Sequence, residues 1–506
     1  MRLRGVLKML AAFLMSQGVA VVTQLLVPPL FIHRYANGVE MYGEWVALTA
    51  AVTYLNTLNY GIQNYANNQM TLHYNRGEVA EAKIVQSSAL RLILIMVLVA
   101  SAAGAAIFFM PIARWMGLRY VSSRAASLTL DFMLLQLVVN WFFAFLSNSY
   151  MAVGELHRGA VWQNVQRLAA TLAMAGFLWD RASFPVLALS QLAVMVLCTI
   201  VVLVEIRFRA PVLVPSLRFG TLRDMWAVLK PSAYYMLYAF SSFFAWQGPV
   251  LLIQKILGPA AVAVFALSRI VFNMSRQILS ILTYSIGQET ITLIARRSWA
   301  QLHRMYDLSE RVVLFFDPVL TVGALLMCPF VFTVWLHKRA LYDPGICMLM
   351  ALVSAVIGLK EHKYAFQYLS NEHQGVARLA LGAYGGMIVI AALTMKAWGI
   401  GAFMLCWLVA ELLIAAYVVV QNRRLFPSDF RPSLAPLPRL AVILVLAFTA
   451  AAWPAWHSVH WPLRSVVVVA AVATLALSVL CYFAFGLREV RGVFQNRLRR
   501  RFAAAP

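Results

Sequence analysis

The sequence predicts an all-α polytopic membrane protein with about fourteen transmembrane helices, and three observations support this. Of its 506 residues, 62% are hydrophobic, and the mean hydropathy is +0.76. Only 12% are Asp, Glu, Lys or Arg, about half the share of soluble domains. Apolar runs long enough to cross about 30 Å of hydrocarbon, which takes about 20 residues, recur along the chain. This composition argues against a water-soluble enzyme.

Fourteen apolar segments follow one another, separated by polar loops. In order they cover residues 10–32, 45–66, 89–110, 127–153, 158–179, 184–206, 232–257, 260–287, 312–335, 344–369, 376–397, 399–420, 440–457 and 463–485. The second, eighth and tenth of these segments are the most polar. We expect each segment to form one helix across the membrane.

Longer polar breaks at 207–231, 288–311 and 421–439 separate these segments into groups. We expect two six-helix pseudo-repeat bundles plus two C-terminal helices. The predicted parts are an N-terminal bundle (1–206), a cytoplasmic linker (207–231), a C-terminal bundle (232–420), a second cytoplasmic linker (421–439), two additional helices (440–485) and a basic cytoplasmic tail (486–506). Two repeated halves with the substrate site between them are a recurring transporter design.

Positive charge predicts the orientation. The chain has 42 Lys and Arg against 19 Asp and Glu, a formal charge of +23. In a membrane protein such an excess marks cytoplasmic loops rather than a nucleic-acid partner. Placing both termini in the cytoplasm puts most basic loops and the arginine-rich tail inside. The exception is the third loop, which places Arg114, Arg119 and Arg124 on the predicted outer side.

Several kinds of chemistry find no support in the sequence. No loop is long enough for a large catalytic domain, and no GxxxxGK[ST], HExxH or GxSxG motif is present. The five cysteines lie far apart without a CxxC pair, so neither a disulfide framework nor a metal site is expected. We expect no cofactor. Transport would then be driven by an ion gradient, by the membrane potential or by a partner.

Charged side chains inside the membrane are the main candidates for a binding site. Each costs about 2.5–3.5 kcal/mol on insertion scales, and such residues normally face a bundle interior or an aqueous cavity. In segment 260–287, Arg269, Asn273 and Arg276 share one helix face. Two arginines one heptad apart would form an anion-binding surface. The alternative is that both pair with acids on neighbouring helices.

Further cations lie on two other segments. Arg167 lies near the middle of 158–179, and its planar guanidinium suits a phosphate. The alternative for Arg167 is a structural role at a helix end or against a neighbouring polar face. Lys360 and Lys363 share a face of 344–369, and they could bind substrate, snorkel to the interface or pair with Glu361.

Acids are scarce within the segments. Glu411 in 399–420 and Asp317 in 312–335 are candidates for coupling a proton or a sodium ion. The interpretation we favour is that they neutralise Lys360, Lys363 or Arg269.

Uncharged polar residues follow helical spacing on several segments. Asn56, Asn59 and Gln63 lie along one flank of the second segment, and Tyr238 is one of several aromatic and hydroxyl residues on the seventh. Amides and aromatic faces are what a glycan needs. Any single one of them can instead anchor the interface or join helices, but their coincidence on several helices predicts a wet cavity.

Short motifs carry a family resemblance. The stretches are Leu26-Val27-Pro28-Pro29-Leu30, Tyr42-Gly43-Glu44-Trp45, Leu58-Asn59-Tyr60-Gly61, Ala66-Asn67-Asn68-Gln69-Met70, and Leu257-Gly258-Pro259 with the residues up to Arg269. They resemble the bacterial polysaccharide-transport flippases of the multidrug/oligosaccharidyl-lipid/polysaccharide exporter superfamily. Asn59 and Gln69 stand where that family usually has Asp and Glu. The motifs cover about residues 20–90 and 255–275, and the layout covers the whole chain.

The resemblance implies a flippase rather than an enzyme. It would move undecaprenyl-diphosphate-linked oligosaccharide repeat units across the bacterial inner membrane, by alternating access, for O-antigen, capsule or exopolysaccharide synthesis. Polymerase and export machinery would be its possible partners. Related lipid II flippases imply cationic cavity residues for the diphosphate and a groove at the last two helices for the lipid tail.

Three alternatives stay open at this point. A cation-coupled multidrug exporter of the same superfamily would need acids in its cavity, and this chain is poor in them. A membrane-embedded polysaccharide polymerase would need a larger loop. A non-transporting scaffold for an export complex would leave the intramembrane polar stripes without a purpose.

Overall fold

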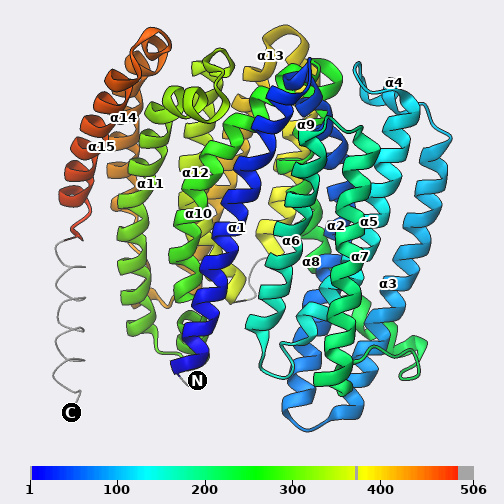
Figure 1. Cartoon of the computed structure of the whole chain (residues 1–506). Coiled ribbons are helices and arrows are strands. Elements are labelled where there is room, and N and C mark those ends of the chain that lie inside the picture. Colours follow the sequence, from blue (N-terminus) through cyan, green and yellow to red (C-terminus); the bar gives the residue numbers. More distant parts are fainter. Residues whose placement is uncertain (1–2, 371–373, 488–506) are drawn as a thin grey trace. The chain divides into compact units, whose positions relative to one another are not determined.

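The computed structural model describes residues 3–370 and 374–487, and within them it contains α- and 3-10 helices and no strand (Figure 1). The α-helices are α1 (Leu3–Arg34), α2 (Gly38–Asn75), α3 (Val79–Phe108), α4 (Ile112–Met116), α5 (Ser123–Ser149), α6 (Leu156–Trp179), α7 (Phe184–Arg209), α8 (Leu222–Trp246), α9 (Gly248–Ile256), α10 (Pro259–Ala295), α11 (Trp299–Leu336), α12 (Pro344–Leu369), α13 (Gln374–Leu425), α14 (Pro436–His457) and α15 (Leu463–Ala484). The predicted all-α polytopic fold is confirmed.

Each predicted segment coincides with helix. The short α4 lies in the third loop, and α8 and α9 share segment 232–257. Segments 376–397 and 399–420 join in α13, where Gly399 breaks the helical geometry with φ 62° and ψ −156°. Among the described residues, ten helices are long and apolar enough to cross a membrane, with α13 counted once.

Two compact units divide the chain. We call Met1–Ala266 the N-unit and Leu267–Pro506 the C-unit. Within the N-unit the most extensive packing joins α5 to α7, α2 to α8 and α1 to α6. Within the C-unit α12 packs on α13, and α11 packs on α12 and α15. The two six-helix bundles expected from a pseudo-repeat, 1–206 and 232–420, stay a prediction.

Two of the motifs behind the family resemblance meet in the N-unit. Gly43 lies so close to the start of α10 that an added Cβ would come within 1.9 Å of the Pro259 carbonyl oxygen. The neighbouring Glu44 accepts hydrogen bonds from the backbone N–H groups of Arg119 and Tyr120 at 2.5 and 3.0 Å. Glycine is needed here because only it lets the two backbones approach so closely.

Trp45 continues this contact into an aromatic cluster. Its ring lies 5.7 Å from that of Phe31 on α1 and 5.4 Å from that of Phe184 on α7, and all three are buried. Aromatic pairs at such distances add about 0.5–1.5 kcal/mol each beyond their buried area. The Tyr42-Gly43-Glu44-Trp45 motif therefore ties α2 to α1, α7, α10 and the loop after α4.

Candidate functional site

A polar cavity of about 310 Å³ lies inside the N-unit, among α2, α5, α6 and α7. Its polar lining consists of hydroxyl and amide side chains and one cation: Thr49, Thr53, Gln136, Asn140, Gln166, Arg167, Thr171 and Gln191. No acid is among the described residues that line it. The cavity is thus electropositive, and it lies inside a membrane-embedded bundle.

Arg167 supplies that charge from the middle of α6. It lies eleven residues after Leu156, about 16 Å along the helix at 1.5 Å per residue. Its side chain is solvent-accessible, and within the described part of the chain no hydrogen bond or ion pair reaches its guanidinium. A cation at this depth without an acid partner is costly, so the site favours an anion.

The other lining groups differ in what they can offer a ligand. Thr49, Thr53 and Thr171 each donate their hydroxyl to the carbonyl four residues earlier, at 2.8–2.9 Å, which leaves them only as acceptors. Gln136 and Asn140 keep both amide donors and acceptors for a ligand, because no hydrogen bond joins their side chains to another described residue. Neutral amides beside a guanidinium suit an anion that carries hydroxyl groups.

A chain of amides next to the cavity holds its helices together. Gln163 on α6 donates to Asn148 on α5 at 3.0 Å, and Gln63 on α2 donates to the Trp141 carbonyl at 2.9 Å. Asn148 also reaches Gln63 at 3.4 Å. The predicted site residue Gln63 thus has a structural partner, and Asn59 is buried with 2% exposure. The side chains of Asn56 and Tyr238 lie outside the described residues.

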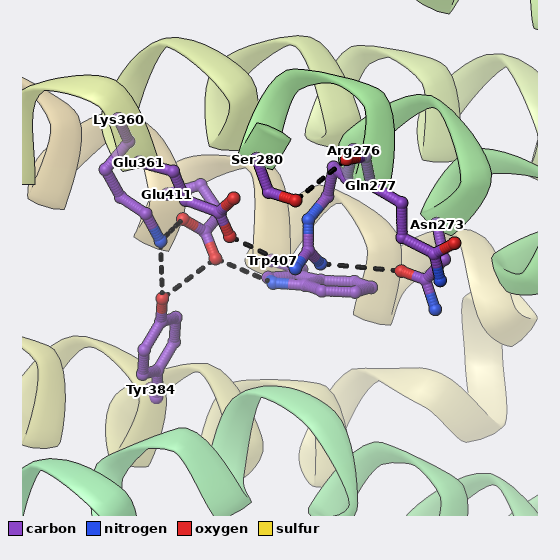
Figure 2. Close-up of polar contacts among 9 residues, drawn as sticks. All are labelled: Asn273, Arg276, Gln277, Ser280, Lys360, Glu361, Tyr384, Trp407 and Glu411. Carbon is purple, nitrogen blue, oxygen red and sulfur yellow. Dashed lines mark hydrogen bonds and ion pairs between the residues drawn. The ribbon is translucent and has the colours of Figure 1, made fainter. Parts of the chain in front are cut away.

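The C-unit carries a second polar cluster, centred on α12 (Figure 2). Lys360 donates to Glu411 on α13 at 2.5 Å, and Glu411 also accepts from Tyr384 at 2.8 Å and from Trp407 at 3.1 Å. Glu361 pairs with Arg276 on α10 at 3.1 Å. Lys360 and Glu411 are therefore ion-pair partners in the structure.

Lys363 is buried more deeply and turns toward α11. It pairs with Glu310 and donates to the Tyr306 hydroxyl at 2.8 Å. Asn422 on α13 donates to the Lys363 carbonyl at 2.8 Å and accepts from Gln367 at 2.9 Å. Three neighbouring charges of α12 thus bind three different helices, which positions α10, α11 and α13 around it.

The arginines of α10 differ in their surroundings. Arg276 is partly buried and donates to Asn273 at 3.4 Å in addition to its pair with Glu361 (Figure 2). Arg269 lies partly buried two turns earlier on the same helix. Substrate binding by Arg269, Asn273, Arg276, Lys360 and Lys363 stays a prediction.

Asp317 on α11 is a buried acid without a partner among the described residues of the C-unit. It is 1% exposed, and neither of its carboxyl oxygens has a hydrogen-bond partner among the described residues. It lies against Gly358 of α12, where an added Cβ would come within 2.1 Å of its Oδ1 atom. A buried carboxylate without a partner is very costly.

Sequence reasoning did not select several of these residues. Gln136, Asn140 and Gln191 lie in predicted spans, but nothing in the sequence shows that they face one cavity. Tyr306 and Glu310 both fall in the predicted break 288–311, although α11 begins at Trp299. Their i, i+4 spacing, which puts both on one helix face, was the available signal.

Comparison with solved structures identifies proteins that share this fold. No family model and no curated protein matches the chain. A structure of the lipid II flippase MurJ in an inward closed conformation matches with a TM-score of 0.69 at 10% identity, over 97% of this chain and 100% of that one.

Transporters with other descriptions match as well. An inward-facing multidrug resistance MATE family transporter of the MOP superfamily matches with a TM-score of 0.66 at 14% identity, over 81% of this chain and 95% of that one. A MOP superfamily transporter from Pyrococcus furiosus matches with a TM-score of 0.54 at 13% identity, over 85% of this chain and 96% of that one. This chain is therefore a multi-pass membrane protein with the fold shared by MATE and MurJ transporters.

Proposed function

We propose that this protein is a flippase that moves undecaprenyl-diphosphate-linked oligosaccharide repeat units across the bacterial inner membrane for surface polysaccharide synthesis. The observation that carries the proposal is the acid-free cavity around Arg167. A lipid-linked oligosaccharide presents a diphosphate at membrane depth with a glycan next to it. An unpaired guanidinium surrounded by free amides is complementary to both parts.

The chemistry of recognition follows from the lining. The planar guanidinium can donate two parallel hydrogen bonds to phosphate oxygens. Gln136 and Asn140 can donate to and accept from sugar hydroxyls, and the threonine oxygens can accept. The cavity volume is at the lower end of small-molecule sites, which span about 300–1,000 Å³. It therefore suits the diphosphate with its nearest sugar rather than a whole oligosaccharide.

Two further observations support a lipid-linked substrate. The likeness to the lipid II flippase covers 97% of this chain, against 81% for the multidrug transporter. Helices α14 and α15 carry several exposed aliphatic side chains and have no charged residue between Leu440 and Trp456 or between Ser465 and Ala484. Such surfaces are compatible with a polyisoprenoid tail.

For the coupling ion we propose a proton on Asp317. Glu411, the other candidate, is occupied by Lys360, Tyr384 and Trp407. Asp317 is the candidate that remains, because neither of its carboxyl oxygens has a hydrogen-bond partner among the described residues. In the proposed orientation both termini face the cytoplasm, and alternating access exposes the substrate to each side in turn.

The second candidate is a cation-coupled multidrug exporter, favoured by the likeness to MATE transporters. The cavity around Arg167 argues against it, because a cationic drug would meet a cation there.

The test is lipid-linked oligosaccharide accumulation in a deletion strain, with the membrane face determined. Cytoplasmic-face accumulation that is rescued by the wild-type gene is the expected result. Arg167→Ala should fail to rescue, since losing a charge-assisted hydrogen bond costs about 1.5–3 kcal/mol, and Arg167→Lys should rescue in part. The exposed Arg124→Ala is the matched control and should rescue fully.

Other outcomes would overturn the proposal. Accumulation on the periplasmic face would mean that translocation is intact and that polymerisation or a later step fails. No accumulation would leave the multidrug exporter as the better candidate. Full rescue by a normally inserted Arg167→Ala protein would remove the cavity from the mechanism.

A further inference from the structure

The linker between α7 and α8 is a surface feature that the proposed flippase mechanism does not use. Residues 210–221, which we call the strap, join the end of α7 at Arg209 to the start of α8 at Leu222. Both helices begin within the N-unit, and α7 is long and apolar enough to cross the membrane up to Arg209. The strap therefore lies at the membrane surface, where α7 leaves the bilayer.

Side chains of α3 hold the strap in place by donating hydrogen bonds to its backbone carbonyl groups. Lys83 donates to the carbonyl of Val214 at 2.8 Å, and Arg91 donates to those of Leu217 and Gly220 at 2.8 and 2.9 Å. Two uncharged side chains between them make the same kind of bond: Gln86 to Leu213 at 2.7 Å and Ser87 to Ser216 at 2.5 Å. The strap thus presents its other side chains from a fixed backbone.

Positive charge predominates on the strap and on the first turns of α8. Arg218, Arg223 and Lys230 are exposed, and no ion pair reaches them within the described part of the chain. Asp224 is the one acid between residues 210 and 230, and its Oδ2 atom accepts from the backbone N–H and the hydroxyl of Thr221 at 2.6 and 2.8 Å. One acid can offset only one of the three cations. The surface therefore favours an anionic partner.

Large apolar side chains are exposed next to these cations. Leu222 and Trp226 are one helical turn apart on α8, and they are 71% and 62% exposed. Phe219 on the strap is 41% exposed. Tryptophan and leucine beside arginine are typical of segments that lie in the membrane interface, because the apolar groups enter the edge of the hydrocarbon while the cations stay at the level of the phosphates.

We propose that the strap and the first turns of α8 bind the headgroups of anionic phospholipids in the leaflet that they face. Arg218 and Arg223 would hold the phosphate, and Leu222 and Trp226 would contact the glycerol and the first acyl carbons. A zwitterionic lipid fits less well, because it carries its own cation beside the phosphate and the protein surface is already positive. The proposal does not rest on the proposed flippase function.

The experiment titrates the purified full-length protein with phosphatidylglycerol and measures the bound lipid by native mass spectrometry. Phosphatidylcholine with the same acyl chains is the charge control. We expect saturable binding of phosphatidylglycerol that is at least about tenfold tighter than that of phosphatidylcholine, and that weakens as the ionic strength rises. Soluble glycerol phosphate should not displace the lipid, because it lacks the acyl chains that meet Leu222 and Trp226.

Four variants locate the site. Arg218→Gln combined with Arg223→Gln should weaken phosphatidylglycerol binding at least about tenfold, whereas lysine at both positions should keep most of it because the charge persists. Trp226→Ser should weaken the binding of both lipids alike, since it removes an apolar contact and no charge. Arg124→Gln removes an exposed arginine elsewhere in the N-unit and should bind like wild type. Each variant is first shown to be monodisperse by size-exclusion chromatography.

The proposal fails if phosphatidylcholine binds as tightly as phosphatidylglycerol, because the surface would then be merely hydrophobic. It also fails if the monodisperse double glutamine variant keeps wild-type affinity, since the lipid would then bind elsewhere. Displacement by glycerol phosphate would overturn the assignment to a lipid in favour of a free anion. An absence of saturable phosphatidylglycerol binding would also overturn it and leave an acidic protein segment as the occupant to test. Loss of oligosaccharide flipping in the strain assay has no bearing on these outcomes.

Discussion

Replacing Lys363 by Met should destabilise the C-unit, because it leaves Glu310 buried without its cation. The two residues are 2% and 3% exposed, so water cannot compensate. Lys363 also donates to Tyr306 at 2.8 Å, and that hydrogen bond is lost too. Methionine has a similar length and flexibility, so the change removes the charge and leaves most of the packing volume in place.

The magnitude follows from the buried charge that Glu310 keeps. Breaking a buried ion pair by removing one partner typically costs about 3–5 kcal/mol. For a unit of this size the apparent Tm should fall by roughly 10 °C.

The assay is thermal unfolding of the detergent-solubilised variant. The double variant Lys363→Met with Glu310→Leu should recover most of the stability, since it removes both charges. The exposed Lys338→Met is the control. An unchanged Tm for Lys363→Met, or a double variant no better than the single one, would refute the reasoning.

Further predictions concern three other places. Gly43→Ala should impair folding or export, measured by yield and rescue, because its methyl group meets the backbone at the start of α10. Arg269→Ala or Arg276→Ala should abolish export while the protein still inserts, and lysine at either position should retain part of it; normal export from both alanine variants would contradict this. Hydrogen bonds from Thr221 hold the pKa of Asp224 below its usual range. The cap at the start of α8 should therefore stabilise the fold at pH values above that range, and this stabilisation should be lost as the pH falls through the lowered pKa. Asp224→Asn should remove this pH dependence of the Tm.

The membrane fold could be predicted from sequence because its signal is local. Each span is an apolar run whose length is set by the bilayer, and every one of the fourteen segments coincides with helix. Element boundaries were less predictable. α11 begins at Trp299, well before residue 312, because a helix continues beyond the hydrocarbon as long as its residues satisfy their own backbone hydrogen bonds.

The sequence also identified the intramembrane charges but could not assign their partners. Arg167, Lys360 and Lys363 look alike in the sequence, as cations on polar helix faces. Tertiary structure separates them: Lys360 meets an acid 51 residues away and Lys363 one 53 residues away, while no described acid pairs with Arg167.

The sequence by itself thus determined the class of protein, the positions of its apolar helical segments and the candidate charges, because hydrophobicity and charge are properties of single residues and short windows. Only the tertiary structure decided which charges are neutralised and which face a cavity. Those outcomes depend on helices that are far apart in the chain but pack side by side. Each pairing affects the free energy of the fold, because an unpaired charge in hydrocarbon is costly.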